Sequence, residues 1–331
     1  MKLVDGVLHS YSGLIPEYNK NIAQFRTLAT SLGEEFSLLD YRYFVIQMLY
    51  LVEYADYNSQ NKLGNGLVNG QSAKALIAET GVNRIIVSST NLYVGRIVGI
   101  GTDWASNSVA KDRKITKVEN YSDGNVSGKV IYFDGDPVNI AVNNTIWGSG
   151  QESGQCDELG MKSGCLINDS IHSMIYRGIE NIFGNMWQFV DGMNIKDRIM
   201  YLCKDHTKYK SDLFESPYKK LGYTNGDTNG YVKTLGFDPD EPLARFPIEV
   251  GAGASSGMSD YYWQNPGNRI ALVGGNFNNG ANCGFWYWNL NNDSSVANVG
   301  RGCRVLIFEI KIIYTSFSLP LGKNRVETGL A

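Results

Sequence analysis

Apolar residues recur at helical spacing in two stretches near the beginning of the chain. Residues 18–32 place Ile22, Phe25 and Leu28 on one side, and Gly33 follows as a residue that commonly ends helices. Asp40 can cap a second helix over residues 41–57. We expect its apolar stripe to pack on a sheet, and the stripe comprises Phe44, Val45, Met48, Leu49 and Val52. A short third helix is expected over residues 70–80.

The pattern changes to strands from residue 83 to about residue 148. Runs rich in Val, Ile and Tyr alternate there with Gly, Asp and Asn turns, as at 122–125 and 134–137. Residues 149–170 are polar and loop-like, 205–260 read as a long irregular stretch, and 304–314 read as a last strand. No repeat and no clean linker interrupts this order, so one elaborated α+β domain is favoured over two.

Composition narrows the classes of function. The 331 residues carry 30 Lys+Arg against 33 Asp+Glu, so the net charge of −3 offers no basic surplus for a nucleic-acid backbone. The longest apolar stretch, 43–55, is interrupted by Gln47 and Glu53 and is too short to cross a bilayer. The first residues contain no apolar signal-peptide core. A chain with 37 Gly and 20 Tyr but 19% charged residues is typical of a loop-rich binding protein.

Cysteine, histidine and carboxylate positions give no standard catalytic or zinc motif. The five cysteines are an odd number; a local bridge between Cys156 and Cys165 is one interpretation, and free buried thiols are the favoured one. In residues 175–195, Glu180 or Asp191 could hold a ligand or metal, but a buried structural ion pair is the preferred interpretation.

Residues 261–304 have the most unusual composition, with ten Asn among 44 residues and several Tyr and Trp. Asparagine offers a donor and an acceptor on a short stem, and the large aromatic residues give contact area at low entropic cost, as in antibody paratopes. A set of purely structural Asn/Gly loops explains the composition equally well.

Four segments resemble motifs of the formylglycine-generating-enzyme (sulfatase-modifying-factor) family, in the order of that family. The sequence GNMWQFVDG at 184–192 resembles its G-N-V-W-E-W-x-D-G, and VGGNF at 273–277 resembles R-G-G-S-W. NVGRGCR at 298–304 stands in the place of N-x-G-F-R, and MLYLVEYA at 48–55 resembles the E-A-E-W-E-Y-A-A helix. The resemblance implies an α+β, C-type-lectin-like fold, loop-rich and with a β-rich insertion.

Within the same superfamily, residues 269–295 resemble the variable regions of diversity-generating-retroelement proteins, which are frequently receptor-binding proteins of phage tails. In that family, adenine-directed mutagenesis changes Asn codons. The resemblance implies ligand-binding positions at Tyr261, Tyr262, Trp263, Asn276, Asn278, Asn279, Asn282, Trp286, Trp288, Asn289 and Asn291.

The resemblance implies a non-enzymatic adhesin at a phage tail tip, assembled in the bacterial cytoplasm, with a bacterial cell surface as the alternative location. Its partners would be a cell-surface receptor, protein or glycan, and other tail proteins, in a homotrimer; nucleic acid and membrane insertion are not expected. No cofactor is expected, and a structural calcium is left open. The alternatives are a structural tail or baseplate component, or an oxidase of the formylglycine-generating type. The oxidase is disfavoured because Cys283 stands near one copper-cysteine position but Asn279 stands near the other.

These interpretations divide the chain into three parts. Residues 1–35 are expected to pack on the core or to make oligomer contacts, 36–310 to form the lectin-like domain with its insertion at 83–148, and 311–331 to be a tail. Residues 184–192, 269–275 and 298–304 should meet in one sheet with Trp187 buried. The six variable-region asparagines should point to solvent, and one of the pairs Trp286/Trp288 and Phe285/Tyr287 should face outward.

Overall fold

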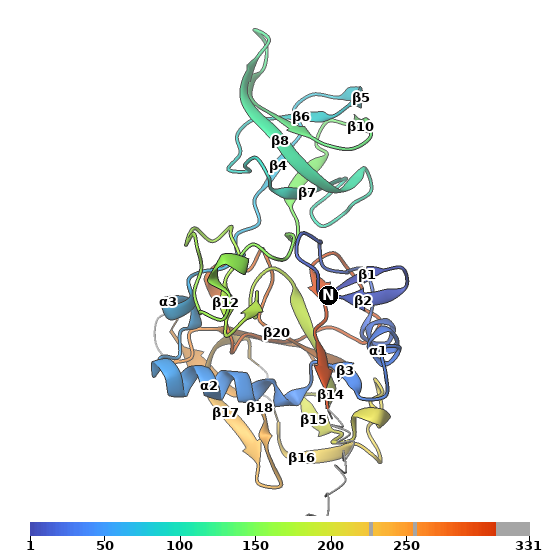
Figure 1. Cartoon of the computed structure of the whole chain (residues 1–331), viewed down its shortest axis with the longest axis vertical. Coiled ribbons are helices and arrows are strands. Elements are labelled where there is room, and N and C mark those ends of the chain that lie inside the picture. The colour runs from blue at the N-terminus through green and yellow to red at the C-terminus, as the bar shows by residue number, and fades with distance from the viewer. Residues whose placement is uncertain (225–227, 254–256, 309–331) are drawn as a thin grey trace, which may run out of the picture.

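The computed structural model describes residues 1–224, 228–253 and 257–308. It is a mixed α+β, strand-rich structure with several antiparallel sheets. Figure 1 shows two parts: a body that holds the chain's helices, and a smaller strand-rich unit that projects from one end of that body. The described helices include none that is long and apolar enough to cross a membrane.

The body is built on a nine-stranded sheet that curls into a half-barrel. In sheet order its strands are β16 (Lys219–Thr224), β15 (Ile199–Leu202), β14 (Trp187–Lys196), β20 (Asn268–Val273), β21 (Trp288–Leu290), β19 (Tyr261–Gln264), β17 (Gly230–Asp238) and β18 (Glu241–Ala252), with β22 (Arg301–Gly302) beside β14. On β14, Gln188 is opposite Val273 in the antiparallel neighbour and opposite Gly302 in the parallel one. The expected meeting of the three motif segments is therefore confirmed.

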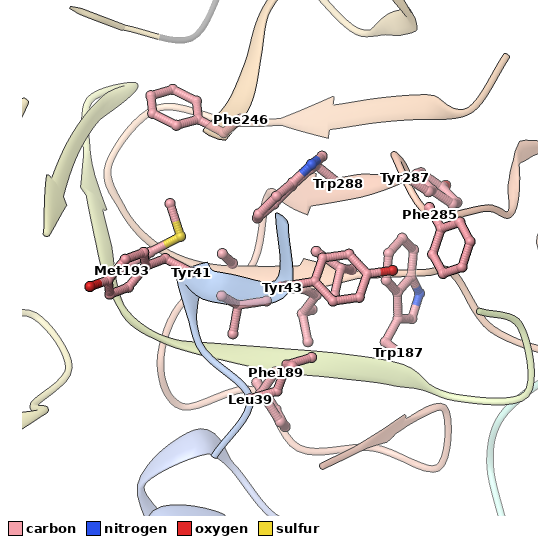
Figure 2. Packing of buried hydrophobic residues seen from close by; sticks show 14 of the residues in the cluster. Leu39, Tyr41, Tyr43, Trp187, Phe189, Met193, Phe246, Phe285, Tyr287 and Trp288 are labelled. Carbon is pink, nitrogen blue, oxygen red and sulfur yellow. The ribbon is translucent and has the colours of Figure 1, made fainter. Parts of the chain in front are cut away.

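The core of the body lies where these segments meet. Trp187 is buried, as expected, and its ring centre lies 4.5 Å from that of Tyr287. Figure 2 shows the two rings beside Phe285, with Trp288 and Tyr43 nearby. The two glycines after β20 allow this close packing. Both have positive φ, and a Cβ on Gly275 would lie 2.3 Å from Cys283 Sγ.

The first two helices form at the expected places, but one of them faces an unexpected way. Helix α1 (Ile22–Thr30) begins at a capping box formed by Asn21 and Gln24, and it buries Phe25 against Phe189. Asp40 caps the short 3₁₀ turn η1 (Tyr41–Tyr43), which leads into α2 (Phe44–Tyr54).

The prediction that the α2 stripe packs on a sheet is wrong for four of its five residues. Phe44 is buried, whereas the other four are exposed: Val45, Met48, Leu49 and Val52. The side of the helix that faces the core carries Phe44, Gln47 and Tyr50 instead. Gln47 can be buried there because its Nε2 donates a hydrogen bond to the Phe285 carbonyl. A third helix, α3 (Ser59–Leu63), follows.

The projecting unit is a six-stranded sheet with its own hydrophobic cluster around Ile85, Val98 and Ile131. In sheet order its strands are β4 (Ser72–Lys74), β11 (Thr145–Gly148), β7 (Ile97–Gly101), β8 (Ala110–Ser122), β9 (Ser127–Phe133) and β6 (Arg84–Val87), and β5 (Glu79–Val82) pairs with β10 (Val138–Ile140). The expected strands of 83–148 are confirmed. The helix expected over 70–80 is wrong, because that segment pairs as β4 and β5.

The remaining elements are short. They are β1 (Lys2–Val4), β2 (Val7–His9), β3 (Phe36–Leu38), η2 (Asp157–Leu159), β12 (Ile175–Tyr176), β13 (Ile179–Glu180), η3 (His206–Lys208), η4 (Gly280–Asn282) and β23 (Val305–Ile307). The prediction of an irregular stretch over 205–260 is wrong, since it contains the long hairpin of β17 and β18. Of the strand expected over 304–314, β23 is seen; the rest, and the tail 311–331, lie outside the described residues.

Candidate functional site

Strand β19 divides its four side chains between the interior and the surface. Tyr262 and Gln264 are buried, whereas Trp263 is 42% exposed and Tyr261 is half-buried. This is the alternation that a strand with one covered side produces. Of the three aromatic positions predicted at 261–263, the structure therefore places the first and third at the surface and the second in the core.

A tyrosine that sequence reasoning did not identify extends this surface. Tyr231 on β17 is opposite Tyr261 in register, and the two rings meet nearly perpendicularly with centres 5.2 Å apart. The Tyr231 hydroxyl donates a hydrogen bond of 3.0 Å to Oδ1 of Asn282. Two strands and the loop 276–283 thus contribute to one surface, the aromatic face, defined as Tyr231, Tyr261, Trp263 and Asn282.

The loop 276–283 is held in place by residues distant in sequence. Gln60 on α3 donates hydrogen bonds from Nε2 to the carbonyls of Gly280 (3.2 Å) and Cys283 (2.8 Å). The Gly280 amide donates to the carbonyl of Val68 at 2.7 Å. These contacts fix the loop backbone, so Asn282 is presented beside Tyr231 in a defined position.

The six predicted asparagines do not all point to solvent. Asn278 is exposed, and Asn279, Asn282 and Asn291 are half-buried, but Asn276 and Asn289 are buried, which corrects the prediction for those two. The reason is local hydrogen bonding to the backbone. Oδ1 of Asn276 accepts the Asn278 amide, and Oδ1 of Asn289 accepts the Asn291 amide.

The asparagines also lie in two groups rather than one patch. Four belong to the loop 276–283, which precedes β21, whereas Asn289 lies within β21 and Asn291 follows it. The first group is connected to the aromatic face by the Asn282–Tyr231 hydrogen bond, and Asn289 of the second group is the register partner of Trp263 on the neighbouring parallel strand.

The prediction that one pair of side chains in 285–288 faces outward is wrong. Phe285, Trp286, Tyr287 and Trp288 are all buried. The Tyr50 ring of α2 lies 5.1 Å from that of Phe285 and 5.8 Å from that of Trp286. Tyr287 packs instead against Trp187 on β14. Trp286 and Trp288 therefore belong to the core and present no exposed side chain, which corrects their assignment to the surface.

A buried carboxylate that the sequence did not single out lies in this layer. Oδ2 of Asp260 accepts the Trp286 amide at 2.8 Å, and burial raises the pKa of Asp260 to about 8. A Cβ on Gly284 would lie 2.2 Å from both carboxylate oxygens, so the glycine makes room for it. The one feature of the sequence that could have indicated a buried carboxyl group is the position of Asp260 directly before the three aromatic residues 261–263.

Trp104 of the projecting unit is a second aromatic residue that sequence reasoning missed. It lies in the loop after β7, is 41% exposed, and its ring centre lies 6.0 Å from Trp147 and 6.4 Å from Phe277. Phe277 belongs to the loop 276–283. The projecting unit therefore packs on the base of the loop that carries Asn282.

The carboxylates considered as ligands have structural partners. Asp191 is buried and accepts two hydrogen bonds from Arg26, at 2.7 and 2.8 Å. Glu180 accepts the backbone amides of Gly154 and Cys156. The preferred interpretation of a buried ion pair is thus confirmed for Asp191, and no described group of three His, Cys, Asp or Glu side chains is arranged to hold a metal.

The described cysteines are all free, so the Cys156–Cys165 bridge is absent. Burial raises the pKa of the Cys283 thiol well above its usual range, which disfavours the thiolate that copper requires. At the other position expected for a copper ligand, Asn279 uses Oδ1 to accept the Asn276 amide at 2.9 Å.

A cavity of about 480 Å³ lies on another part of the body, between the N-terminal segment, β13 and β22. Its charged groups already have partners. Nε of Arg304 donates to Oε1 of Gln188 at 2.6 Å, and the Glu180 carboxylate is bound to backbone amides. The charged side chains of Arg304, Glu180 and Asp157 in this cavity are therefore already hydrogen-bonded to neighbouring groups of the body.

No protein-family model matches the chain, and no curated protein is recognisably similar to it. We therefore infer the function from the chemistry of this protein's own surfaces.

Proposed function

We propose that this chain is a non-enzymatic ligand-binding protein whose aromatic face contacts a receptor on a bacterial cell surface. The observation that carries the proposal is exposed Trp263 next to half-buried Tyr261 and the Tyr231–Asn282 hydrogen bond, beside a loop whose backbone is bound by Gln60. Tyr and Trp side chains supply large contact areas with few rotatable bonds, and amides supply donors and acceptors. Rigid aromatic anchors with polar neighbours are typical of binding surfaces.

The scaffold is proposed to be C-type-lectin-like, with residues 83–148 as an insertion. Two observations support this assignment. Three of the four segments that carry the family resemblance meet at β14. In addition, Asp191 of the GNMWQFVDG segment is bonded to Arg26 of α1, so the motif joins helix to sheet.

The aromatic face is proposed to be diversifiable, as in retroelement-targeted proteins. Exposed Asn278 and half-buried Asn282 lie in a loop whose backbone is held by Gln60 and by Asn276. Side chains at the exposed positions can change while such a backbone stays in place. We further propose that the protein acts at a phage tail tip, together with other tail proteins; a protein and a glycan receptor are equally compatible with Tyr, Trp and Asn.

Retention of the purified chain on a panel of intact gut-bacterial strains tests the proposal. Trp263→Ala and Tyr261→Ala should each weaken binding at least about 10-fold, about 1.4 kcal/mol, because they remove anchors of the face. Tyr11→Ala is the matched control, since Tyr11 is an exposed tyrosine on the N-terminal segment and should change binding little.

Three results would contradict the proposal. Binding that survives both substitutions would place the receptor contact elsewhere. Absence of binding to every strain would favour a structural tail component. Stoichiometric copper binding that Cys283→Ser abolishes would instead support the oxidase alternative.

A further inference from the structure

Helix α2 turns one stripe of apolar side chains outward, while Ile46 and Leu51 pack on the core. Val52 is 81% exposed, and three more aliphatic or thioether side chains of the helix are exposed: Val45, Met48 and Leu49. A helix packed on a core normally does the reverse. Glu53 is the one charged residue among the eleven in α2, so no row of charges solubilises this side.

The apolar surface continues beyond the beginning of the helix. The Arg245 guanidinium on β18 lies 5.0 Å from the ring centre of Phe44 and 4.2 Å from that of Phe237 on β17. Phe237 and Leu243 are exposed. We call this surface the α2 face and define it as Val45, Met48, Leu49, Val52, Phe237 and Leu243. Figure 1 shows α2 along the outside of the body, and contiguous apolar surfaces of this kind are typical of interaction sites.

The two ends of the α2 face carry opposite uncompensated charges. At the beginning, Arg245 has no carboxylate within 4 Å in the described ranges, and its Nε donates to the Pro242 carbonyl. Beyond the end of the helix, Asp56 has no described cation within 4 Å and accepts hydrogen bonds from the Asn58 amide and from Asn61. Glu53 is already paired with Arg177 at 3.0 Å.

We propose that the α2 face is a contact between two copies of this chain, related by a two-fold axis that crosses the middle of α2. In such a contact the same surface is used twice, so the two helices run antiparallel and Val45 faces the partner's Val52. The apolar residues at intervals of three and four fit the same ridges on an antiparallel helix. Antiparallel packing also places Arg245 near the partner's Asp56, so the end charges are complementary. This inference is independent of the proposed ligand.

Light scattering of the full chain at increasing micromolar concentration tests the proposal. The wild type should reach twice the 36.7 kDa of one chain. Val52→Glu should weaken association by at least about 100-fold, because it would bury an unpaired charge in the contact. The control is Met161→Glu, in the 149–170 loop. The exposed fraction of Met161, 77%, is similar to the 81% of Val52. Met161 is not part of the α2 face, so the substitution should leave the dimer unchanged.

A charge-reversal pair tests the two-fold geometry. Arg245→Glu and Asp56→Arg should each weaken the dimer, and the double variant should recover association, since the opposite charges then meet again. Thermal melting of each variant shows whether the chain is still folded.

Four outcomes would overturn the proposal. One is a wild type that keeps the mass of one chain, which would leave the α2 face to another protein or to residues 309–331. The others are a dimer unaffected by Val52→Glu, a three-chain assembly, and a double variant no stronger than the single ones.

Discussion

Asparagine has two different roles in the segment between residues 276 and 291. Asn276, Asn279 and Asn289 accept backbone amides with their side-chain oxygens and shape the turns around β21. Asn278 is exposed, and Asn282 bonds to a tyrosine hydroxyl of the aromatic face. The first three therefore contribute to stability, and the other two are available for contact.

Substituting one asparagine of each kind should separate the roles. Asn276→Ala should lower the free energy of unfolding by about 1–3 kcal/mol, because the buried Asn276 side chain no longer accepts the Asn278 backbone amide. Asn278→Ala, at an exposed position, should stay within about 0.5 kcal/mol of the wild type. Denaturant unfolding measures both; equal stabilities of the two variants would contradict the assignment.

Asp260 should make stability depend on pH. Burial raises its folded pKa from 3.8 to about 8, so between these values the folded chain holds a proton that the unfolded chain releases. The stability from the neutral carboxyl is therefore complete below about pH 4 and is lost as the pH rises toward 8.

Asp260→Asn keeps an acceptor for the Trp286 amide but cannot ionise. Its stability relative to the wild type should grow with pH from about 4 to 8, by at most about 1.4 kcal/mol per pH unit. Denaturant midpoints across this range give the difference directly. A difference that is constant with pH would show that Asp260 is ionised in the folded chain.

Composition alone could not distinguish the buried from the exposed Asn and aromatic residues of 261–304. The abundance of Asn and aromatic residues at 261–304 did indicate a special surface. Whether a given asparagine faces solvent depends on which backbone amide lies next to it, as for Asn276, and that is fixed by the turn. Likewise, Trp286 is buried because Tyr50 of α2 packs on it, a contact between segments more than 200 residues apart that the local sequence does not show.

At the scale of elements, helix α1 and the meeting of the motif segments were predicted correctly from short stretches of the sequence. The spacing of Ile22, Phe25 and Leu28 predicted α1, and the motif segments predicted the meeting of β14 with β20 and β22. Two failures have a shared cause. Residues 72–82 contain helix-favouring Ala, Lys and Glu but pair as β4 and β5, and 230–252 contain turn residues but form a hairpin. Long-range strand pairing outweighed local preference in both.

The prediction of which side of α2 faces the core was wrong for a different reason. Periodicity identifies an apolar side of a helix but does not say what covers it. In α2 the aromatic residues and Gln47 occupy the core side, and the aliphatic stripe is left to the surface.

The Arg26–Asp191 pair ties α1 to β14, and its removal tests how that element is held. Arg26→Ala should destabilise the chain by about 3–5 kcal/mol, because Asp191 is buried and would lose its counter-charge. Arg26→Met with Asp191→Leu should recover most of this loss, since neither charge then remains buried.

Denaturant unfolding is the measurement, and Lys208→Ala is the control because its pair with Asp205 is exposed. A double variant as unstable as Arg26→Ala would contradict the assignment of the pair as an isolated structural link.

At the scale of the whole molecule, the body supports one surface with several layers. Buried Trp288 is the register partner of Tyr262 on the neighbouring strand of the same sheet, and buried Asp260 accepts the Trp286 amide. Gln60 holds the adjoining loop, and the projecting unit packs on Phe277 through Trp104. The central claim is that this arrangement holds the backbone of the aromatic face so firmly that its outer side chains can vary and change what is bound.

A library of the full chain diversified at Trp263, Asn278 and Asn282 tests this claim most directly. The measurement is the binding profile of its folded members across a panel of intact bacterial strains, with thermal melting used to identify those members. We predict that most members stay folded, since substitutions at exposed Trp263 and Asn278 change stability within about 0.5 kcal/mol and loss of the Asn282–Tyr231 hydrogen bond costs about 1 kcal/mol. The strain preferences of the folded members should differ from the wild type and from one another. A library whose folded members all keep the wild-type profile, or in which most members fail to fold, would contradict the claim.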